Sequence, residues 1–194
     1  MKRDFSNESI LNLIFRGLKS FNVRMRGTLY CILNIFHDKS CLGLCIGLNP
    51  KFINSKSIKL GKNVSLGNFT RIECFNGKNK SIQLNIGDES SFGDYLHIGV
   101  SSSIFIGKGV LGGSNILIID HNHGTCDPME LRNLDVIPRK REIINKGEII
   151  IEDNVWIGDD VKILGNVRIG IGSVIAAGSI LTKDVLPFTV YIKK

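Results

Sequence analysis

Two of the four histidines of this chain lie in the stretch DHNHG, residues 120–124. An imidazole can bind a metal ion, accept a proton as a general base, or hydrogen-bond to the backbone of a turn. His121 and His123 are two residues apart, so in an extended strand both side chains project to the same side. The pair therefore offers a metal site, a catalytic base with a helper, or two polar turn residues. The sequence on either side of the pair is needed to choose between these three roles.

A long polar segment follows the histidines and is the second clue to their role. Residues 124–147 contain two prolines and many polar side chains, and they break the regular spacing found on both sides. A loop of this length in a compact repeat protein is more often functional than idle. Because the loop leaves directly from His121 and His123, its position favours a catalytic or binding role for the pair.

A six-residue period surrounds the histidines and the loop. Every sixth residue is large and apolar, and the residue after it is usually small. After the loop, the large positions are Ile151, Ile157, Ile163, Ile169, Ile175 and Leu181. Before it, less regularly, they are Leu60, Leu66, Ile72, Ile86, Phe92, Ile98 and Ile106.

Repeats of this length are typical of a β-helix, in which each short strand forms one side of a coil. The large residues stack inside the prism, and the small residue allows the tight corner that follows. A β-sandwich with glycine-rich turns would not keep this spacing over six consecutive units. We therefore expect an all-β domain over residues 51–194, a β-helix interrupted by the loop 124–147, and a basic helical segment with its lead-in over residues 1–50.

The N-terminal segment has its own period. Apolar residues within 8–36 recur close to helical spacing, and Arg16, Lys19, Arg24 and Arg26 are interleaved with them. Such a helix can cover the open end of the β-helix, because the terminal coil of a solenoid must be shielded. It can also rest on the anionic face of a membrane. The two roles are compatible.

Composition limits the remaining classes. The formal charge is +7, with +8 in residues 1–62 and −1 in residues 63–194, so a nearly neutral body carries a basic end. That end could meet anionic lipid, nucleic acid or an acidic sugar chain, or be a solvated face. No apolar stretch approaches the roughly 20 residues of a membrane span, and no signal-peptide pattern is present. We expect a cytoplasmic protein, able to touch the membrane, with its five cysteines as reduced thiols.

Four stretches resemble the hexapeptide-repeat acyltransferases, in their xenobiotic and sugar O-acetyltransferase branch. IEDNVWIGDDVKI (151–163) is similar to the coil that follows the active-site loop there, and IGSVIAAGSILTKDV (171–185) to the coenzyme A coil. DYLHI (94–98) and DHNHG (120–124) are most similar to lipopolysaccharide O-antigen acetyltransferases. The resemblance covers roughly residues 58–188.

The resemblance implies a left-handed parallel β-helix and a homotrimer. Each of its three sites would lie between adjacent prisms and take acetyl-CoA and a sugar or polysaccharide precursor, with no metal and no nucleic acid. The matching catalytic histidine is His121. Candidate acceptor contacts are His97, His123, Asp94 and Tyr95. Trp156 is a candidate for lining the acyl-donor cleft, and the positions that match coenzyme A contacts are Asp159, Ala177, Thr182 and Lys183.

The chemistry agrees with this assignment. A sugar hydroxyl is a poor nucleophile at neutral pH, so a base must take its proton as it attacks the thioester. Imidazole, with a pKa near 6.5, suits that role, and general-base help is worth about 10²–10⁴-fold. No Gly-x-Ser-x-Gly nucleophile motif is present, which favours direct transfer in a ternary complex. We therefore expect an acetyl-CoA-dependent O-acetyltransferase of O-antigen, capsule or exopolysaccharide biosynthesis.

Two alternatives stay open at this point. His97, His121 and His123 could be three zinc ligands, as in β-helical carbonic anhydrases, and stoichiometric zinc in the purified protein would support that hypothesis. The chain could also be a non-catalytic β-helical scaffold. A failure to bind acetyl-CoA even at millimolar concentration would favour the scaffold.

Overall fold

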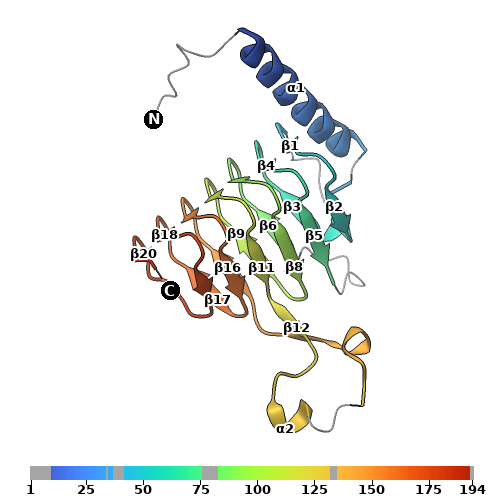
Figure 1. Ribbon diagram of the computed structural model, residues 1–194, viewed down its shortest axis with the longest axis vertical. Coiled ribbons are helices and arrows are strands. Elements are labelled where there is room, and N and C mark those ends of the chain that lie inside the picture. The colour runs from blue at the N-terminus through green and yellow to red at the C-terminus, as the bar shows by residue number, and fades with distance from the viewer. Residues whose placement is uncertain (1–9, 34, 37–41, 76–82, 132–134, 193–194) are drawn as a thin grey trace.

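The computed structural model describes residues 10–33, 35–36, 42–75, 83–131 and 135–192. After an N-terminal helix, short strands are stacked in coils, and the strands of successive coils pair side by side (Figure 1). All strand pairs in the three larger sheets are parallel, while the loop carries one antiparallel pair. The described residues therefore form a parallel β-helix with a projecting loop.

We name the three larger sheets A, B and C, in the order in which the chain visits them within a coil. Sheet A contains β1 (Cys45–Ile46), β4 (Ser65–Leu66), β7 (Ser91–Phe92), β10 (Leu111–Gly112), β15 (Trp156–Ile157), β18 (Val174–Ile175) and β20 (Val190–Tyr191). Sheet B contains β2 (Lys51–Ile53), β5 (Arg71–Cys74), β8 (His97–Val100), β11 (Leu117–Ile119), β16 (Lys162–Leu164) and β19 (Ile180–Leu181). Sheet C contains β3 (Ile58–Leu60), β6 (Leu84–Ile86), β9 (Ile104–Ile106), β14 (Ile149–Ile151) and β17 (Val167–Ile169).

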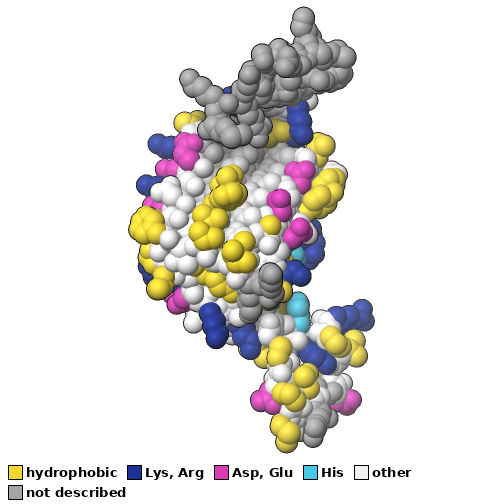
Figure 2. Space-filling view, turned by 60° about the vertical axis from the view of Figure 1, so that its left-hand side comes forward, with side chains coloured by type: hydrophobic (Ala, Val, Ile, Leu, Met, Phe, Trp, Pro, Cys, Tyr) yellow, Lys and Arg dark blue, Asp and Glu magenta, His cyan; other side chains and the backbone are white. Residues whose placement is uncertain are grey.

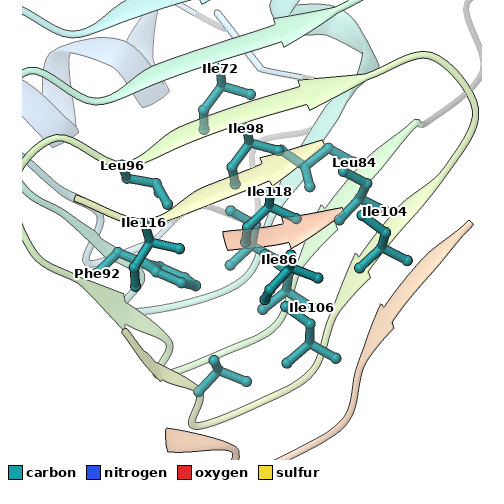
Figure 3. Packing of buried hydrophobic residues seen from close by; sticks show 14 of the residues in the cluster. Ile72, Leu84, Ile86, Phe92, Leu96, Ile98, Ile104, Ile106, Ile116 and Ile118 are labelled. Atoms are coloured by element: carbon teal, nitrogen blue, oxygen red, sulfur yellow. The ribbon is translucent and has the colours of Figure 1, made fainter. Parts of the chain in front are cut away.

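The six-residue period is the period of the core. The large positions of the second run, Ile151, Ile157, Ile163, Ile169, Ile175 and Leu181, are all at most 1% exposed. Figure 3 shows Ile72, Ile98 and Ile118, one from each of three neighbouring strands of sheet B, stacked in the interior. Each such side chain contributes about 1.5–3 kcal/mol when it leaves water, so stacked coils stabilise what one coil cannot.

The corners between strands are tightly packed. A Cβ atom on Gly67, between sheets A and B, would lie 2.3 Å from the carbonyl oxygen of Gly93 in the next coil. One carboxylate oxygen of Asp94 accepts the backbone N–H of Asn68 at 2.7 Å, and Asp159 accepts that of Ser114 in the same way at 2.6 Å. Small residues and side-chain caps therefore hold neighbouring coils together at this corner.

The long insertion leaves the prism without disturbing it. Leu111 pairs with Trp156, and Leu117 with Lys162, so the coils on either side of the insertion stack directly on one another. The insertion begins with β12 (His121–His123), which pairs antiparallel with β13 (Ile143–Asn145). Between them lie the short helix α2 (Pro128–Leu131) and the turn Pro138–Lys140, and this part projects away from the prism (Figure 1).

The predicted N-terminal helix is present as α1 (Ile10–Ile32), and a 3-10 turn, Ser55–Ser57, precedes β3. The Arg26 Nε donates to the Ile46 carbonyl at 2.9 Å, and the Tyr30 ring packs against Phe36 and Phe52. The C-terminal half of α1 thus covers the first coil, as expected of a cap. Within the described ranges, no helix combines the length and the apolar character needed to cross a bilayer.

The expectation of five reduced thiols is wrong at Cys31, which is disulfide-bonded. Five cysteines leave room for up to two pairs, so the count alone could not exclude a disulfide. Cys45, Cys74 and Cys126 are free. Burial raises the pKa of the Cys74 thiol to about 12, so this thiol stays protonated inside the prism.

Candidate active site

His121 stands where sheet B releases the loop, and its side chain is held on three sides. It is only 7% exposed, and its Nδ1 lies 3.0 Å from Oδ1 of Asp120. Phe75 meets the imidazole edge-on, with the ring centroids 4.8 Å apart. Beneath the ring lies Gly99, where an added Cβ would be 2.9 Å from Cε1 of His121. The imidazole therefore fills a space that exists because residue 99 has no side chain.

Asp120 fixes the orientation of this imidazole. It is fully buried, and its two oxygens accept the backbone N–H groups of Ser101 and Ser102, each at 2.7 Å. A carboxylate only accepts hydrogen bonds, so the nitrogen of His121 that faces it carries the proton. That tautomer leaves a lone pair on Nε2, which is the state required of a general base.

Asp120 was not among the site residues predicted from the sequence. In a regular strand, adjacent side chains point to opposite faces, so Asp120 and His121 were not expected to meet. The chain bends between β11 and β12, and backbone hydrogen bonds from Asp120 N to Gly99 O and from Lys146 N to Asp120 O hold the bend. The only available signal was that an acidic residue directly precedes His121.

The imidazole of His121 lines a cavity of about 210 Å³ on the outer face of sheet B. Its ring centroid is 5.9 Å from that of His123, so both histidines of the DHNHG stretch reach this cavity. Figure 2 shows histidine side chains at the junction between the prism and the projecting loop. The cavity is lined by Arg71, Glu73, Phe75, His97, Gly99, Ile119, His121 and His123.

A charged cluster forms the wall of the cavity farthest from the loop. Glu73 is 4% exposed, and its carboxylate meets Arg71 Nη2 at 2.6 Å and Lys51 Nζ at 3.2 Å. Burial acts to raise the pKa of Glu73, but the hydrogen bonds and charges of these two cations prevail and lower it. A third contact of the Glu73 carboxylate, with His97 Nε2 at 3.6 Å, links the cluster to the histidines. Burial and the nearby Arg71 lower the pKa of His97, while Glu73 acts in the opposite direction.

Asp94 and Tyr95 lie elsewhere and do not line this cavity. Both belong to the corner between sheets A and B, where the carboxylate of Asp94 is bonded to the backbone and side chain of Asn68. Tyr95 has a positive φ of 60° and stacks on Phe69, with ring centroids 5.1 Å apart. The turn at Tyr95 separates these two residues from His97, which the sequence had placed in the same group.

Three of the five residues predicted to contact the acyl donor come together in a second cavity. Trp156, Asp159 and Ala177 line a space of about 420 Å³ at the corner between sheets A and B. Thr182 and Lys183 follow β19, at the opposite edge of sheet B, and do not line it. The two cavities share no lining residue, so a single prism keeps His121 apart from the second cavity.

His97, His121 and His123 do not form a metal-ligand set. Among the residues that the structure describes, no group of three or more His, Cys, Asp or Glu side chains is arranged to hold a metal ion. The zinc alternative therefore lacks the three-histidine geometry on which it depends.

Comparisons with known proteins agree with this architecture. A family model described as "Bacterial transferase hexapeptide (six repeats)" matches residues 148–183. An Escherichia coli K12 protein named "Putative lipopolysaccharide biosynthesis O-acetyl transferase WbbJ" is 32% identical over 140 residues, which cover 71% of this chain and 68% of that protein.

Two solved structures share the fold. A mutant of the N-acyltransferase AntD from Bacillus cereus, in complex with dTDP-4-amino-4,6-dideoxyglucose and coenzyme A, matches with a TM-score of 0.58 at 17% identity, covering 74% of this chain and 72% of that one. A hexapeptide-repeat-containing acetyltransferase from Vibrio cholerae matches with a TM-score of 0.51 at 22% identity, covering 86% and 82%.

Proposed function

Since the chain belongs to the hexapeptide-repeat acyltransferase family, we propose that it transfers an acetyl group from acetyl-CoA to a hydroxyl of a sugar. The observation that carries this proposal is the buried Asp120–His121 pair, which opens into a cavity of its own. A sugar acceptor is supported by the lipopolysaccharide acetyltransferase named above and by the nucleotide sugar bound to AntD. The acceptor class we favour is a precursor of O-antigen, capsule or exopolysaccharide.

In the proposed reaction His121 is the general base. Its Nε2 takes the proton of the acceptor hydroxyl as the oxygen attacks the thioester carbonyl carbon. The tetrahedral intermediate then collapses, the carbon–sulfur bond breaks, and the leaving thiolate of coenzyme A receives the proton from His121. Asp120 keeps Nδ1 protonated throughout and stabilises the imidazolium that forms between the two steps.

The acceptor contacts in this proposal differ partly from those expected. His97 and His123 are kept, because both line the cavity of His121. Glu73 and Arg71 take the place of Asp94 and Tyr95, since the former lie in the cavity and the latter do not. A carboxylate held by two cations is a fixed acceptor for sugar hydroxyls, and the guanidinium is a donor.

We place acetyl-CoA in the second cavity, against Trp156, Asp159 and Ala177. Thr182 and Lys183 would then contact the coenzyme from a different edge of the prism. Because one prism keeps the two cavities apart, the proposal includes a homotrimer in which the acetyl-CoA cavity of one subunit meets the His121 cavity of its neighbour. The left-handed winding of the coils belongs to the same proposal.

A turnover assay with acetyl-CoA and a panel of lipid-linked and nucleotide sugars tests the function. We expect His121→Ala to lower kcat by about 100-fold or more while acetyl-CoA binds with unchanged affinity, because only the base is lost. His123→Ala is the matched control, since it removes an imidazole that has no contact with Asp120. We expect it to lower kcat less than about tenfold. Wild-type turnover by His121→Ala, or an equal loss in both variants, would contradict the assignment of the base.

A further inference from the structure

Helix α1 exposes a continuous apolar stripe. Leu18, Phe21, Met25, Leu29 and Ile32 are 53%, 61%, 54%, 52% and 73% exposed. At 3.6 residues per turn, these five positions fall within an arc of about 80°. More than half of each of these large apolar side chains is exposed to water. Such an apolar patch on a surface helix indicates a surface that contacts a membrane or another protein.

The stripe is not the face that caps the β-helix. The contacts with the prism come from the other side of α1, where buried Gly27 lets the helix backbone touch the carbonyl of Leu44 and where Tyr30 packs on Phe36 and Phe52. Gly27 lies about 160° around the helix from Met25, at the middle of the stripe. The helix therefore has two apolar faces, and the prism accounts for only one of them.

Positive charge flanks the stripe. Lys19 lies beside one edge of the stripe and Arg24 beside the other, at about 60–80° from the nearest apolar position. Arg26 lies on the same side as Lys19, and its Nε donates to the Ile46 carbonyl of the first coil. No Asp or Glu occurs between residues 10 and 32. Apolar residues on one face with cations along both sides are the arrangement of helices that lie in the headgroup region of a bilayer. Each such cation adds to the attraction toward an anionic surface.

We propose that α1 attaches this protein to an anionic lipid surface, with the stripe from Leu18 to Ile32 inserted at the boundary of the acyl chains. A second copy of the chain is the less suitable occupant, because two such helices would bring their cations together with no acidic residue on either helix to offset them. The prism stays outside the bilayer, held by its contacts with Gly27 and Tyr30 on the opposite face of α1. This inference does not depend on the proposed acetyl transfer.

Sedimentation of the 194-residue chain with lipid vesicles tests the proposal. We expect binding to vesicles of phosphatidylcholine mixed with phosphatidylglycerol, weakened at least about tenfold when phosphatidylglycerol is omitted or salt is raised. Phe21→Ser combined with Leu29→Ser should weaken binding at least about tenfold, since two large side chains no longer leave water. The matched control is Leu186→Ser with Phe188→Ser, two residues 76% and 78% exposed on the last coil, and it should bind like wild type.

Two results would overturn the proposal. One is wild-type binding by the Phe21→Ser/Leu29→Ser variant whose circular dichroism shows the helix intact. The other is absence of vesicle binding by the wild type, together with a smaller assembly mass for this variant in light scattering. That second result would assign the stripe to a contact between copies of the chain.

Discussion

Asp120 is the residue on which the chemistry of His121 depends. Its carboxylate accepts three hydrogen bonds, from Ser101 N, Ser102 N and Nδ1 of His121. Asp120→Asn removes the negative charge that stabilises the imidazolium, and it turns one oxygen into an N–H donor that faces either the imidazole or the Ser102 N–H, so the base is weakened. We expect kcat to fall about 100-fold or more with little change in acetyl-CoA affinity.

The kcat per folded enzyme and its pH dependence distinguish a role of Asp120 in positioning His121 from a merely structural role. If Asp120 only supports the backbone of Ser101 and Ser102, Asp120→Asn should lower the melting temperature while the remaining folded enzyme keeps its kcat and its pH profile. A kcat per folded enzyme equal to that of the wild type would therefore contradict the positioning role.

His97 gives a prediction on protonation. Burial and Arg71 lower its pKa, and Glu73 is the partner that raises it. Glu73→Gln should therefore lower the pKa of His97 further, measured by an NMR titration of its ring protons. The sign for stability follows from the lowered pKa: as pH falls below the ordinary value near 6.5, the unfolded chain takes up the proton first and folding weakens. An upward shift in Glu73→Gln would contradict this account.

For single residues, the sequence could predict those that lie in a recognisable stretch or next to the loop, but not those that come from a distant strand. His121 was predicted because the loop leaves directly from it, and His97 because it belongs to the DYLHI stretch that carries the resemblance; both line the cavity. Glu73 and Arg71 were missed because they come from a strand two positions away in sheet B, and no local pattern links them to the histidines. Asp94 and Tyr95 were grouped with His97 because all three belong to the DYLHI stretch that carries the family resemblance.

Among the elements of the prism, Gly67 and Gly99 are two glycines whose replacement should have different effects, one on stability and the other on catalysis. A Cβ on Gly67 would meet the backbone carbonyl of Gly93 at 2.3 Å, and backbone inside a stack of coils cannot move aside. A Cβ on Gly99 would meet the tip of the His121 side chain at 2.9 Å, which can rotate away. We expect Gly67→Ala to cost about 1–3 kcal/mol or more of unfolding free energy, and Gly99→Ala to cost less but to displace the base.

Thermal unfolding and kcat, measured on both variants, check this pair. Gly67→Ala should lower the melting temperature while the molecules that remain folded keep their turnover. Gly99→Ala should keep most of its stability and lose about tenfold or more in kcat, since a base displaced by a fraction of an ångström loses its alignment. The opposite pattern in the two variants would show that Gly99 is a packing residue like Gly67.

Most of the fold was predictable because the elements follow the sequence period. The six-residue spacing of large apolar residues marks the interior of every coil, and the helical spacing of residues 8–36 marks α1. The second apolar face of α1 was not separated from the first, because a sequence pattern shows that a helix has apolar residues but not which of them the neighbouring coil covers.

In the whole molecule, the His121 cavity and the second cavity lie apart on one prism, so their positions bear on how subunits assemble. His121 lies at the edge of sheet B where the loop departs, while Ala177 and Trp156 line the corner between sheets A and B. In a ring of subunits joined head to tail, the surface with His121 on one copy faces a different surface on the next. The proposed trimer therefore builds every site from two chains.

Mixed oligomers test this arrangement. His121→Ala removes the base, and Ala177→Glu fills the second cavity with an anionic side chain that repels the coenzyme phosphates, so each variant alone should be nearly inactive. When equal amounts are unfolded together and refolded, roughly a quarter of the sites should combine an intact His121 from one subunit with an intact second cavity from its neighbour. Turnover should then return to about a quarter of the refolded wild type. If base and coenzyme cavity act within one subunit, every subunit in the mixture carries one defect, and the mixture stays as inactive as its parents.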